Sequence, residues 1–331
     1  MIITKTPFRL SFFGGGTDYP DYYLEHGGAV LGTSINKYCY ISCRFLPPFF
    51  DHKYRIAYSR IENARGIDEI EHPAVKAVLN YLNIDRGLEI HHDGDLPARS
   101  GMGSSSSFTV GMLNAIHVLN GRMVPKYELA MQAIEVEQKI IGEKVGSQDQ
   151  VFAAMGGFNL IKFNRDGSIT VNPVIMSSER KTDLNNHLLI FFSGVTRNSQ
   201  TITPKKILNI KKKKNDLFEM RSMVDEGLKI ISSAERDICD FGRLMHESWK
   251  LKRGISSLIS TDLIDDIYTT AIDSGALGGK LLGAGGGGFL AFFAPPERHE
   301  KIKRALSSYI HVPFRFENNG SNVCVYEPNG L

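Results

Sequence analysis

The sequence predicts an α+β protein built from two domains. Segments typical of strands and of helices follow one another without the regular βαβ alternation of a doubly wound parallel sheet. The chain has 331 residues, of which 42% are hydrophobic and 23% are charged, so it is long enough to form two globular cores. We place the boundary after residue 175, which gives an N-terminal domain of residues 1–175 and a C-terminal domain of residues 176–331.

In the N-terminal domain, strands are expected where β-branched and aromatic residues cluster, and helices where apolar residues recur every three or four positions. Pro73 is typical of a helix start, and Asn120-Gly121 is typical of a helix end. The segment 29–45 alternates apolar and polar residues, which indicates either two strands or one long bent strand. The expected strands are 2–13, 29–45, 87–92 and 158–163, and the expected helices are 73–82, 105–119, one beginning at 125, and 148–155.

The C-terminal domain contains a lysine-rich stretch that indicates a long helix over residues 199–233. Its lysines at 205, 206 and 211–214 are interpreted as a solvated helix face, because the net charge is only +3 and no aromatic residues interleave with them. Nucleic acid is therefore not an expected partner. The other expected elements are strands at 187–194, 289–294 and 322–327 and helices at 237–251, 261–273 and 297–308.

Cysteine spacing and hydropathy argue against several classes of protein. The four cysteines include no C-x-x-C pair, so the spacing of a zinc finger is absent, and they are few for a disulfide scaffold. No apolar run reaches 18 residues and the N-terminus has no long apolar stretch, so neither a membrane span nor a signal peptide is expected. We expect a reduced, cytoplasmic protein with no membrane partner.

The strongest functional signal is a serine-rich loop at residues 97–107, PARSGMGSSSS, directly before a helix. Gly101 and Gly103 allow the backbone to approach a ligand closely, and the amides of a first helical turn favour anions such as phosphate. The serine hydroxyls add donors, and one could ligate Mg²⁺. An ordinary capped helix with a flexible approach is the alternative, but a cap needs one serine rather than four.

Two further loops are rich in glycine. The C-terminal glycine loop, residues 283–288, precedes the strand-like run FLAFFA, whereas a dinucleotide-binding fingerprint requires a helix there. A Walker A motif also fails, because Lys280 is followed by Leu281. The loop has more small residues than a β-turn needs, which indicates close approach to a ligand or to another backbone. The N-terminal glycine loop, residues 14–18, is compatible with an ordinary turn.

Three charged residues are candidates for phosphoryl-transfer chemistry. Asp149, in VGSQDQ, could accept or orient the proton of an acceptor hydroxyl. Glu137 could hold Mg²⁺, which suits one carboxylate together with phosphate oxygens. Arg9, on the first expected strand, could stabilise charge that develops on the transferred group. Each also has an ordinary structural explanation as a helix cap, a surface carboxylate or a cation at a strand end.

The three loops, in this order, resemble the motifs of the GHMP kinases, the family of galactokinase and of homoserine, mevalonate and phosphomevalonate kinases. The matching segments, TPFRLSFFGGGTDYPDYYLEHGG, LPARSGMGSSSSFTVGML and GGKLLGAGGGGFLAFF, span nearly the whole chain. The resemblance implies a ribosomal-protein-S5-like N-terminal domain, a ferredoxin-like C-terminal domain, and ATP and substrate in the cleft between them. Gly14-Gly15-Gly16 stands where galactokinase has Gly-Glu-His, which argues against galactose as the substrate.

The resemblance also implies roles for individual residues. Asp149 and Arg9 match the catalytic residues of galactokinase-like members, and Ser105 and Glu137 match ligands of Mg²⁺. The residues expected to contact the substrate are Asp18, Gly15, Gly16, Gly285, Gly286 and Arg197. The residues expected to hold ATP are Gly101, Met102, Gly103, Ser104, Ser105 and Ser106.

Within the family, the segments FRLSFFGGGTDYPDYY, DLPARSGMGSSSSF and FFSGVTRNSQ are similar to bacterial sugar kinases that act at the anomeric hydroxyl. This implies transfer of the ATP γ-phosphoryl group to O1 of a heptose 7-phosphate, giving a 1,7-bisphosphate for GDP-heptose and surface polysaccharide synthesis. A phosphorylated sugar needs a cationic pocket. Arg197 is the first choice for that pocket, and Arg99, Lys5 and Lys280 are further candidates.

Other functions stay open at this point. The chain could be another small-molecule kinase of the family, fucokinase-like or acting on mevalonate or phosphomevalonate, or a decarboxylase of the diphosphomevalonate type. A non-catalytic binding or regulatory member is a third class, because folds can lose their chemistry. The residues favour an enzyme, since Asp149, Glu137 and the loop serines are all present. Either a monomer or a homodimer is expected.

Overall fold

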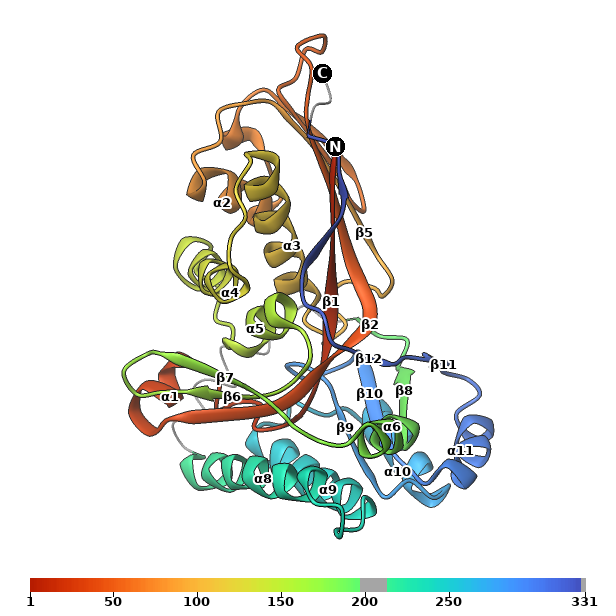
Figure 1. Ribbon diagram of the computed structural model, residues 1–331. Helices are drawn as coiled ribbons and strands as arrows, with labels where there is room; N and C mark the ends of the chain where they lie inside the picture. Colours follow the sequence, from red (N-terminus) through yellow and green to blue (C-terminus); the bar gives the residue numbers. More distant parts are fainter. Residues whose placement is uncertain (197–212, 329–331) are drawn as a thin grey trace.

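The computed structural model describes residues 1–196 and 213–328 as two β-sheets flanked by helices (Figure 1). In these ranges the larger sheet has nine strands and the smaller has four. Strands and helices are mixed without regular alternation, so the predicted α+β class is confirmed. Arg197 and the lysines at 205, 206, 211 and 212 lie outside the described residues.

Two long strands, β1 (Ile2–Phe13) and β2 (Gly28–Phe45), form the axis of the larger sheet. They run antiparallel along almost the whole length of β1, and their register shifts between Pro7 and Phe8. The first part of β2 pairs with β6, and its last part pairs with β5. The segment 29–45 therefore forms one long strand rather than two, and it connects two regions of the sheet.

The remaining strands of the larger sheet extend from this axis. The strand order is β13-β1-β2-β5-β3-β4, with β6 and β12 also paired to β2 and β7 paired to β6. The pairing of β3 with β5 is parallel, whereas the pairs along β1 and β2 are antiparallel. The bounds are β3 (Tyr54–Ala57), β4 (Ile61–Ala64), β5 (Leu88–Gly94), β6 (Phe158–Phe163), β7 (Ile169–Pro173), β12 (Phe316–Glu317) and β13 (Asn322–Tyr326).

A layer of helices covers one face of the larger sheet (Figure 1). Its central helix, α3, is apolar on most sides and is buried along most of its length, as expected of a helix between a sheet and other helices. At Gly111 a Cβ atom would lie 2.8 Å from Thr6 Oγ1, so only glycine lets α3 approach β1 this closely. The bounds are α1 (Pro20–His26), η1 (Ile67–Glu69), α2 (Pro73–Tyr81), α3 (Ser104–Leu119), α4 (Lys126–Glu135), the π-helical turn η2 (Val136–Ile140) and α5 (Gln148–Met155).

The smaller sheet has the strand order β11-β8-β10-β9 and is antiparallel throughout. Helix α9 lies close against β9, because a Cβ atom at Gly278 would come within 2.0 Å of the Gly242 carbonyl oxygen. The strands are β8 (Leu188–Phe192), β9 (Gly278–Leu281), β10 (Phe289–Phe293) and β11 (Ile310–His311). The helices are α6 (Ser178–Asn186), α8 (Lys214–Ser232), α9 (Cys239–Ile255), α10 (Asp262–Asp273), η3 (Pro296–Arg298) and α11 (His299–Ala305).

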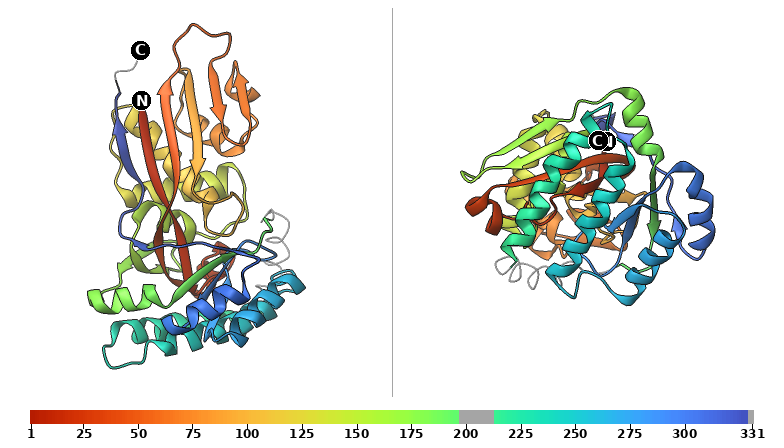
Figure 2. Two further views of the ribbon diagram at one scale, coloured as in Figure 1. Left: turned by 90° about the vertical axis from the view of Figure 1, so that its right-hand side faces the viewer. Right: turned by 90° about the horizontal axis from the view of Figure 1, so that it is seen from below.

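The last strands of the chain return to the larger sheet. β12 pairs with β2 beside Ile35, and β13 pairs with β1, so that Ile2 lies opposite Tyr326 (Figure 2). The predicted boundary after residue 175 falls between β7 and α6, and it stays a prediction. Both sheets nevertheless contain strands from the C-terminal half of the chain.

Aromatic side chains connect the two sheets. The ring of Phe241, on α9, contacts Phe12 and Phe13 of β1 edge-on, with centroid distances of 5.1 and 5.0 Å. It also contacts Phe293 of β10 at 6.1 Å. All four side chains are almost completely buried. The two sheets are thus joined by a shared apolar core.

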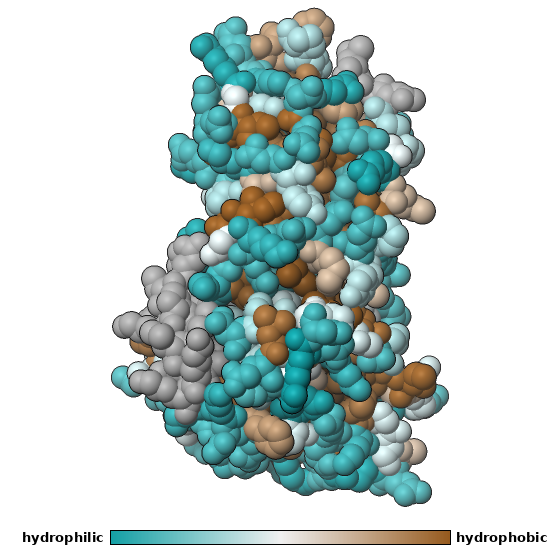
Figure 3. All heavy atoms as spheres, turned by 90° about the vertical axis from the view of Figure 1, so that its left-hand side faces the viewer, coloured by the Kyte–Doolittle hydropathy of each residue, from teal (hydrophilic) through white to brown (hydrophobic). Residues whose placement is uncertain are grey.

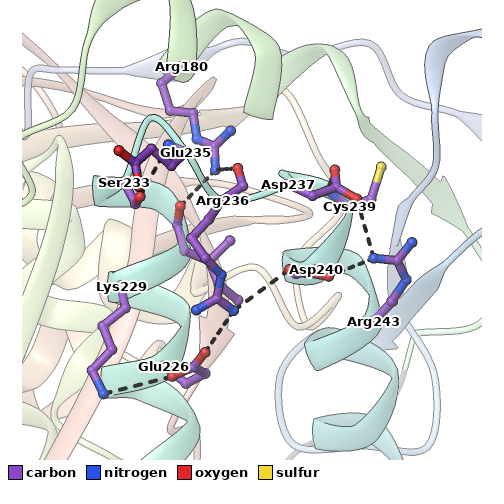
Figure 4. A network of polar contacts seen from close by, with 11 residues as sticks. Arg180, Glu226, Lys229, Ser233, Glu235, Arg236, Asp237, Cys239, Asp240 and Arg243 are labelled. Carbon is purple, nitrogen blue, oxygen red and sulfur yellow. Dashed lines mark hydrogen bonds and ion pairs between the residues drawn. The ribbon is translucent and has the colours of Figure 1, made fainter.

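Polar contacts join helices at the surface of the C-terminal half (Figure 4). The Arg180 guanidinium, from α6, donates to the carbonyl oxygens of Ile230 and Arg236 at 2.7 and 2.8 Å. Arg236 in turn forms ion pairs with Glu226 and Asp240. Exposed ion pairs contribute little individually, so the Arg180 contacts to backbone oxygens are the more specific link between α6 and the turn from α8 to α9.

On the face shown in Figure 3, hydrophilic side chains cover most of the area and hydrophobic ones appear as separate patches. Across residues 1–196 and 213–328, no helix has the length and apolar character needed to cross a membrane.

The junction made by Phe241 generates a stability prediction. Phe241→Ala removes a buried ring that touches both sheets, and we expect it to lower the free energy of unfolding by about 3–5 kcal/mol. Phe218→Ala, on the exposed side of α8, is the matched control and should change it by less than about 0.5 kcal/mol. Urea unfolding followed by circular dichroism measures both values. Equal effects in the two variants would show that Phe241 does not join the sheets.

Candidate active site

A cavity of about 730 Å³ brings the three predicted loops together. Gly15 and Gly16 line it from the N-terminal glycine loop, and Gly101, Gly103 and Ser104 to Ser106 line it from the serine-rich loop. The C-terminal glycine loop contributes Gly283, Ala284, Gly285 and Gly287. Segments more than 250 residues apart in the sequence therefore form one site.

Two of these loops touch backbone to backbone. Gly101 has φ +84°, and a Cβ atom there would lie 2.4 Å from the Leu282 carbonyl oxygen. Gly283 has φ +78°, and its Cβ atom would lie 2.5 Å from the Cα atom of Gly101. A side chain at either position would be strained and would also collide with the opposite loop. At these two positions the close approach predicted from the sequence is to another backbone.

The serine-rich loop leads directly into α3. Gly103 is the N-cap residue in a left-handed conformation, and no side chain caps the first turn. The hydroxyl of Ser104 instead accepts a hydrogen bond from the Arg99 amide at 3.2 Å. Met102 is buried and is not part of the cavity wall, and its carbonyl oxygen accepts from the Arg9 amide at 3.1 Å. The start of α3 thus presents backbone amides to the cavity, as an anion site requires.

Arg9 and Asp149 form a two-pronged ion pair at the edge of this loop. Nε of Arg9 donates to Oδ1 of Asp149 at 2.8 Å, and Nη2 donates to Oδ2 at 2.9 Å. Nη1 donates to the Gly101 carbonyl oxygen at 2.6 Å. Arg9 is 5% exposed and Asp149 is 25% exposed, so the carboxylate is the more accessible partner. The arginine holds the carboxylate in one orientation facing the cavity.

Glu137 lies on the π-helical turn η2 at the wall of the cavity and is 1% exposed. Ser106 Oγ donates to its Oε2 at 2.9 Å, and the Gln150 amide donates to the same oxygen. Its Oε1 is buried and has no hydrogen-bond partner among the described residues. Burial raises the pKa of Glu137 to about 7, although the hydrogen bonds from Ser106 and Gln150 lower it in part.

The Glu137 carboxylate suits a magnesium ion that also binds water and phosphate oxygens, rather than a metal ion held by protein side chains alone. In the described part of the chain, no group of three or more His, Cys, Asp or Glu side chains could hold a metal. Mg²⁺ usually takes one or two carboxylates and completes its shell with water and phosphate oxygens. The unpartnered Oε1 of Glu137 suits that role, and Ser105 lines the same cavity. The hydrogen bond to Glu137 comes from Ser106 rather than from Ser105.

Four of the predicted substrate residues line the same cavity: Asp18, Gly15, Gly16 and Gly285. Asp18 is 1% exposed, and its carboxylate accepts from the Gly16 amide and from Gln148 Nε2, both at 2.8 Å. Gly286 is not part of the wall and donates its amide to the Ile259 carbonyl oxygen. Arg197 falls outside the described residues.

Sequence reasoning missed several residues of the cavity. Gln148 and Gln150 flank Asp149. Gln148 donates to Asp18, and Gln150 donates to Glu137. The two glutamines in SQDQ are the signal in the sequence for these contacts. Lys252, on α9, also lines the cavity. Among the other cations considered, Lys280 and Arg99 line it, whereas Lys5 lies over the Tyr38 ring.

An aromatic region forms one end of the cavity. The ring of His72 stacks on Phe108 at 4.7 Å, and Tyr58 meets His72 edge-on at 4.9 Å. The ring of His92 meets that of Phe108 edge-on, with a centroid distance of 5.1 Å. Burial lowers the pKa of His72 to about 4, so the imidazole is neutral near pH 7. These rings offer flat surfaces at this end of the cavity, beside the Arg60–Glu71 ion pair.

Glu137 generates a prediction about pH. Its pKa is about 7 in the folded protein against an ordinary value of 4.5. Between these pH values the folded state keeps a proton that the unfolded state releases, so stability falls as the pH rises. The shift of 7 − 4.5 = 2.5 corresponds to about 3 kcal/mol.

Glu137→Gln should remove this contribution, because the amide does not ionise. Urea unfolding of both proteins without metal, from about pH 5 to pH 8, measures the difference. We expect the free energy of unfolding of the original protein to fall relative to that of the variant as the pH rises. Parallel curves for the two proteins would contradict the raised pKa.

Comparison with known proteins places the chain in a family. Residues 70–157 match the model of the GHMP kinases N terminal domain, and residues 230–311 match that of the GHMP kinases C terminal domain. The chain is 31% identical over 319 residues to a D-glycero-alpha-D-manno-heptose 7-phosphate kinase of Campylobacter jejuni, with coverage of 92% of this chain and 93% of that protein.

Solved structures show the same fold. A crystal structure of a D-glycero-D-manno-heptose 1-phosphate kinase from Bacteroides thetaiotaomicron has a TM-score of 0.81 at 24% identity and covers 99% of this chain and 100% of that one. A mevalonate kinase structure has a TM-score of 0.74 at 21% identity, with coverage of 96% and 100%. The fold expected from the three motifs is thereby confirmed. The chain belongs to the GHMP kinase family and is a phosphotransferase.

Proposed function

We propose that this protein is an ATP-dependent sugar kinase that phosphorylates O1 of D-glycero-D-manno-heptose 7-phosphate and gives the 1,7-bisphosphate. The observation that carries the proposal is the Arg9–Asp149 ion pair, which holds a partly exposed carboxylate beside the uncapped start of α3. The Campylobacter relative, 31% identical along almost the whole chain, supports a heptose phosphate as the substrate. The Bacteroides structure supports the same substrate class, although its name gives a different phosphate position.

The residues suit an in-line phosphoryl transfer. The O1 hydroxyl of the sugar attacks the γ-phosphorus of ATP, the bond to the β–γ bridging oxygen breaks, and ADP leaves. Asp149 orients the hydroxyl and accepts its proton. Arg9 keeps Asp149 in place and adds positive charge beside the transferred group, and Asp18 with Gly15 and Gly16 positions the sugar.

ATP fits the remaining parts of the cavity. The amides at the start of α3, with Gly101, Gly103 and Ser104 to Ser106, would hold its phosphates, and the Met102 carbonyl fixes that loop to β1. The aromatic region around His72 and Phe108 would take the planar base. Glu137 and Ser105 would hold Mg²⁺, which neutralises phosphate charge during transfer.

A substrate panel tests this function. We expect ADP release with Mg-ATP to be fastest with D-glycero-D-manno-heptose 7-phosphate, and slower with the unphosphorylated heptose, fucose, galactose, mevalonate and phosphomevalonate. Phosphorus NMR of the product should show a new phosphate at O1. A higher rate with any other acceptor, or release of CO₂ from a diphosphomevalonate, would overturn the proposal.

Asp149→Asn tests the role of the carboxylate. The amide keeps the size of the side chain but cannot accept a proton, so kcat should fall about 10²- to 10⁴-fold while the KM for ATP changes little. Asp225→Asn, on the exposed face of α8, is the control and should keep full activity. Melting temperatures check that both variants fold. A fully active Asp149→Asn enzyme would exclude Asp149 as the proton acceptor.

A further inference from the structure

Two lysines line the wall of the cavity that the C-terminal half of the chain provides. Lys252 is on α9 and Lys280 is on β9, and each is only 4% exposed. Lysine is seldom buried this completely, because an ammonium group loses its hydration unless other groups replace it. Both residues nevertheless line the cavity, which indicates a role there.

Backbone oxygens fix the positions of both ammonium groups. Lys280 Nζ donates to the carbonyl oxygen of Phe12 at 2.7 Å, at the end of β1. Lys252 Nζ donates to the carbonyl oxygens of Leu281 and Gly283 at 3.0 and 2.9 Å. Leu281 follows Lys280 directly, so the two lysines hold neighbouring parts of β9 and the C-terminal glycine loop. The two positive charges therefore occupy fixed places beside that loop.

Charge is distributed unevenly around the cavity. The carboxylates that line it are Asp18, Glu71, Glu137, Glu143 and Asp149, all from the N-terminal half. Within the described lining, the wall from residue 252 to residue 287 contains the two lysines and no carboxylate. The lysine wall is thus the side of the cavity that attracts an anion.

The position of Lys280 indicates which anion binds. Its partner Phe12 lies two residues before the N-terminal glycine loop, whose Gly15 and Gly16 line the cavity together with Asp18. The start of α3 already offers amides for the phosphates of a nucleotide. A phosphate monoester on the sugar is therefore the anion that this wall suits.

We infer that Lys252 and Lys280 form the subsite for the phosphate that the sugar substrate already carries. The inference rests on the proposed function and deepens it, because it names the residues that select a phosphorylated sugar over a free one. Each ammonium group supplies charge-assisted hydrogen bonds to phosphate oxygens, and the backbone contacts hold it in position before the substrate arrives.

The test uses Lys280→Met and Lys252→Met, with Lys250→Met as the control. Methionine keeps much of the length of the side chain and removes the charge, and Lys250 is an exposed lysine on the same helix as Lys252. Charged hydrogen bonds predict that the KM for heptose 7-phosphate rises about tenfold or more in each cavity variant. The KM for ATP and the kcat/KM for the unphosphorylated heptose should change several-fold less than the KM for heptose 7-phosphate does, and Lys250→Met should change none of these values.

The outcomes separate the two sources of phosphate. An equal rise in the KM for ATP would show that the lysines serve the nucleotide, and it would overturn the subsite. An equal loss of kcat/KM with the phosphorylated and unphosphorylated sugars would show a structural role and would overturn it as well. Melting temperatures identify any variant that does not fold, in which case Lys280→Gln replaces Lys280→Met and Lys252→Gln replaces Lys252→Met.

Equilibrium binding makes the subsite testable apart from catalysis. Calorimetry without ATP should show that heptose 7-phosphate binds the original protein more tightly than heptose does, and that this preference is lost in Lys280→Met. If the protein turns over no sugar phosphate but still shows lysine-dependent binding of it, the proposed function fails and the subsite stands. If sugar kinase activity is present but phosphorylated and free heptose bind equally, the subsite fails and the kinase activity stands.

Discussion

The guanidinium group of Arg9 fixes three segments of the chain relative to one another. It extends from β1, pairs with Asp149 at the start of α5, and donates to the Gly101 carbonyl oxygen in the serine-rich loop. Removing Asp149 would leave the charge of the nearly buried Arg9 without its partner, which destabilises the folded protein. The position of the carboxylate and the path of the loop are therefore set together, by one side chain that the core around β1 holds still.

The cavity gathers groups that are unfavourable to bury, and the surrounding structure compensates for them. Burial raises the pKa of Glu137 to about 7, and the buried lysines of the opposite wall donate to backbone oxygens. Burial of titratable groups in a concave site is typical of functional centres. The aromatic core that joins the sheets through Phe241 supplies apolar burial that offsets this cost.

Much of the architecture could be predicted because it depends on local sequence. Pro73 begins a helix, the glycines of the three loops mark where backbones approach closely, and their residues share one cavity. The π-helical turn at Glu137 and the pairing of β13 with β1 depend on contacts between distant segments, which periodicity does not report. Lys250 and Lys252 look equivalent in the sequence, and only packing shows that one is exposed and the other lies in the cavity.

The pairing of β13 with β1 affects the order in which the protein can assemble. Residues 322–326 are translated long after β1, so until they have left the ribosome the Ile2–Lys5 edge of β1 lacks its partner strand. Unpaired strand edges promote association with other chains, and contacts between such distant residues form slowly. The larger sheet therefore reaches its final form only after β13 has been translated, and the nascent protein exposes that edge until then.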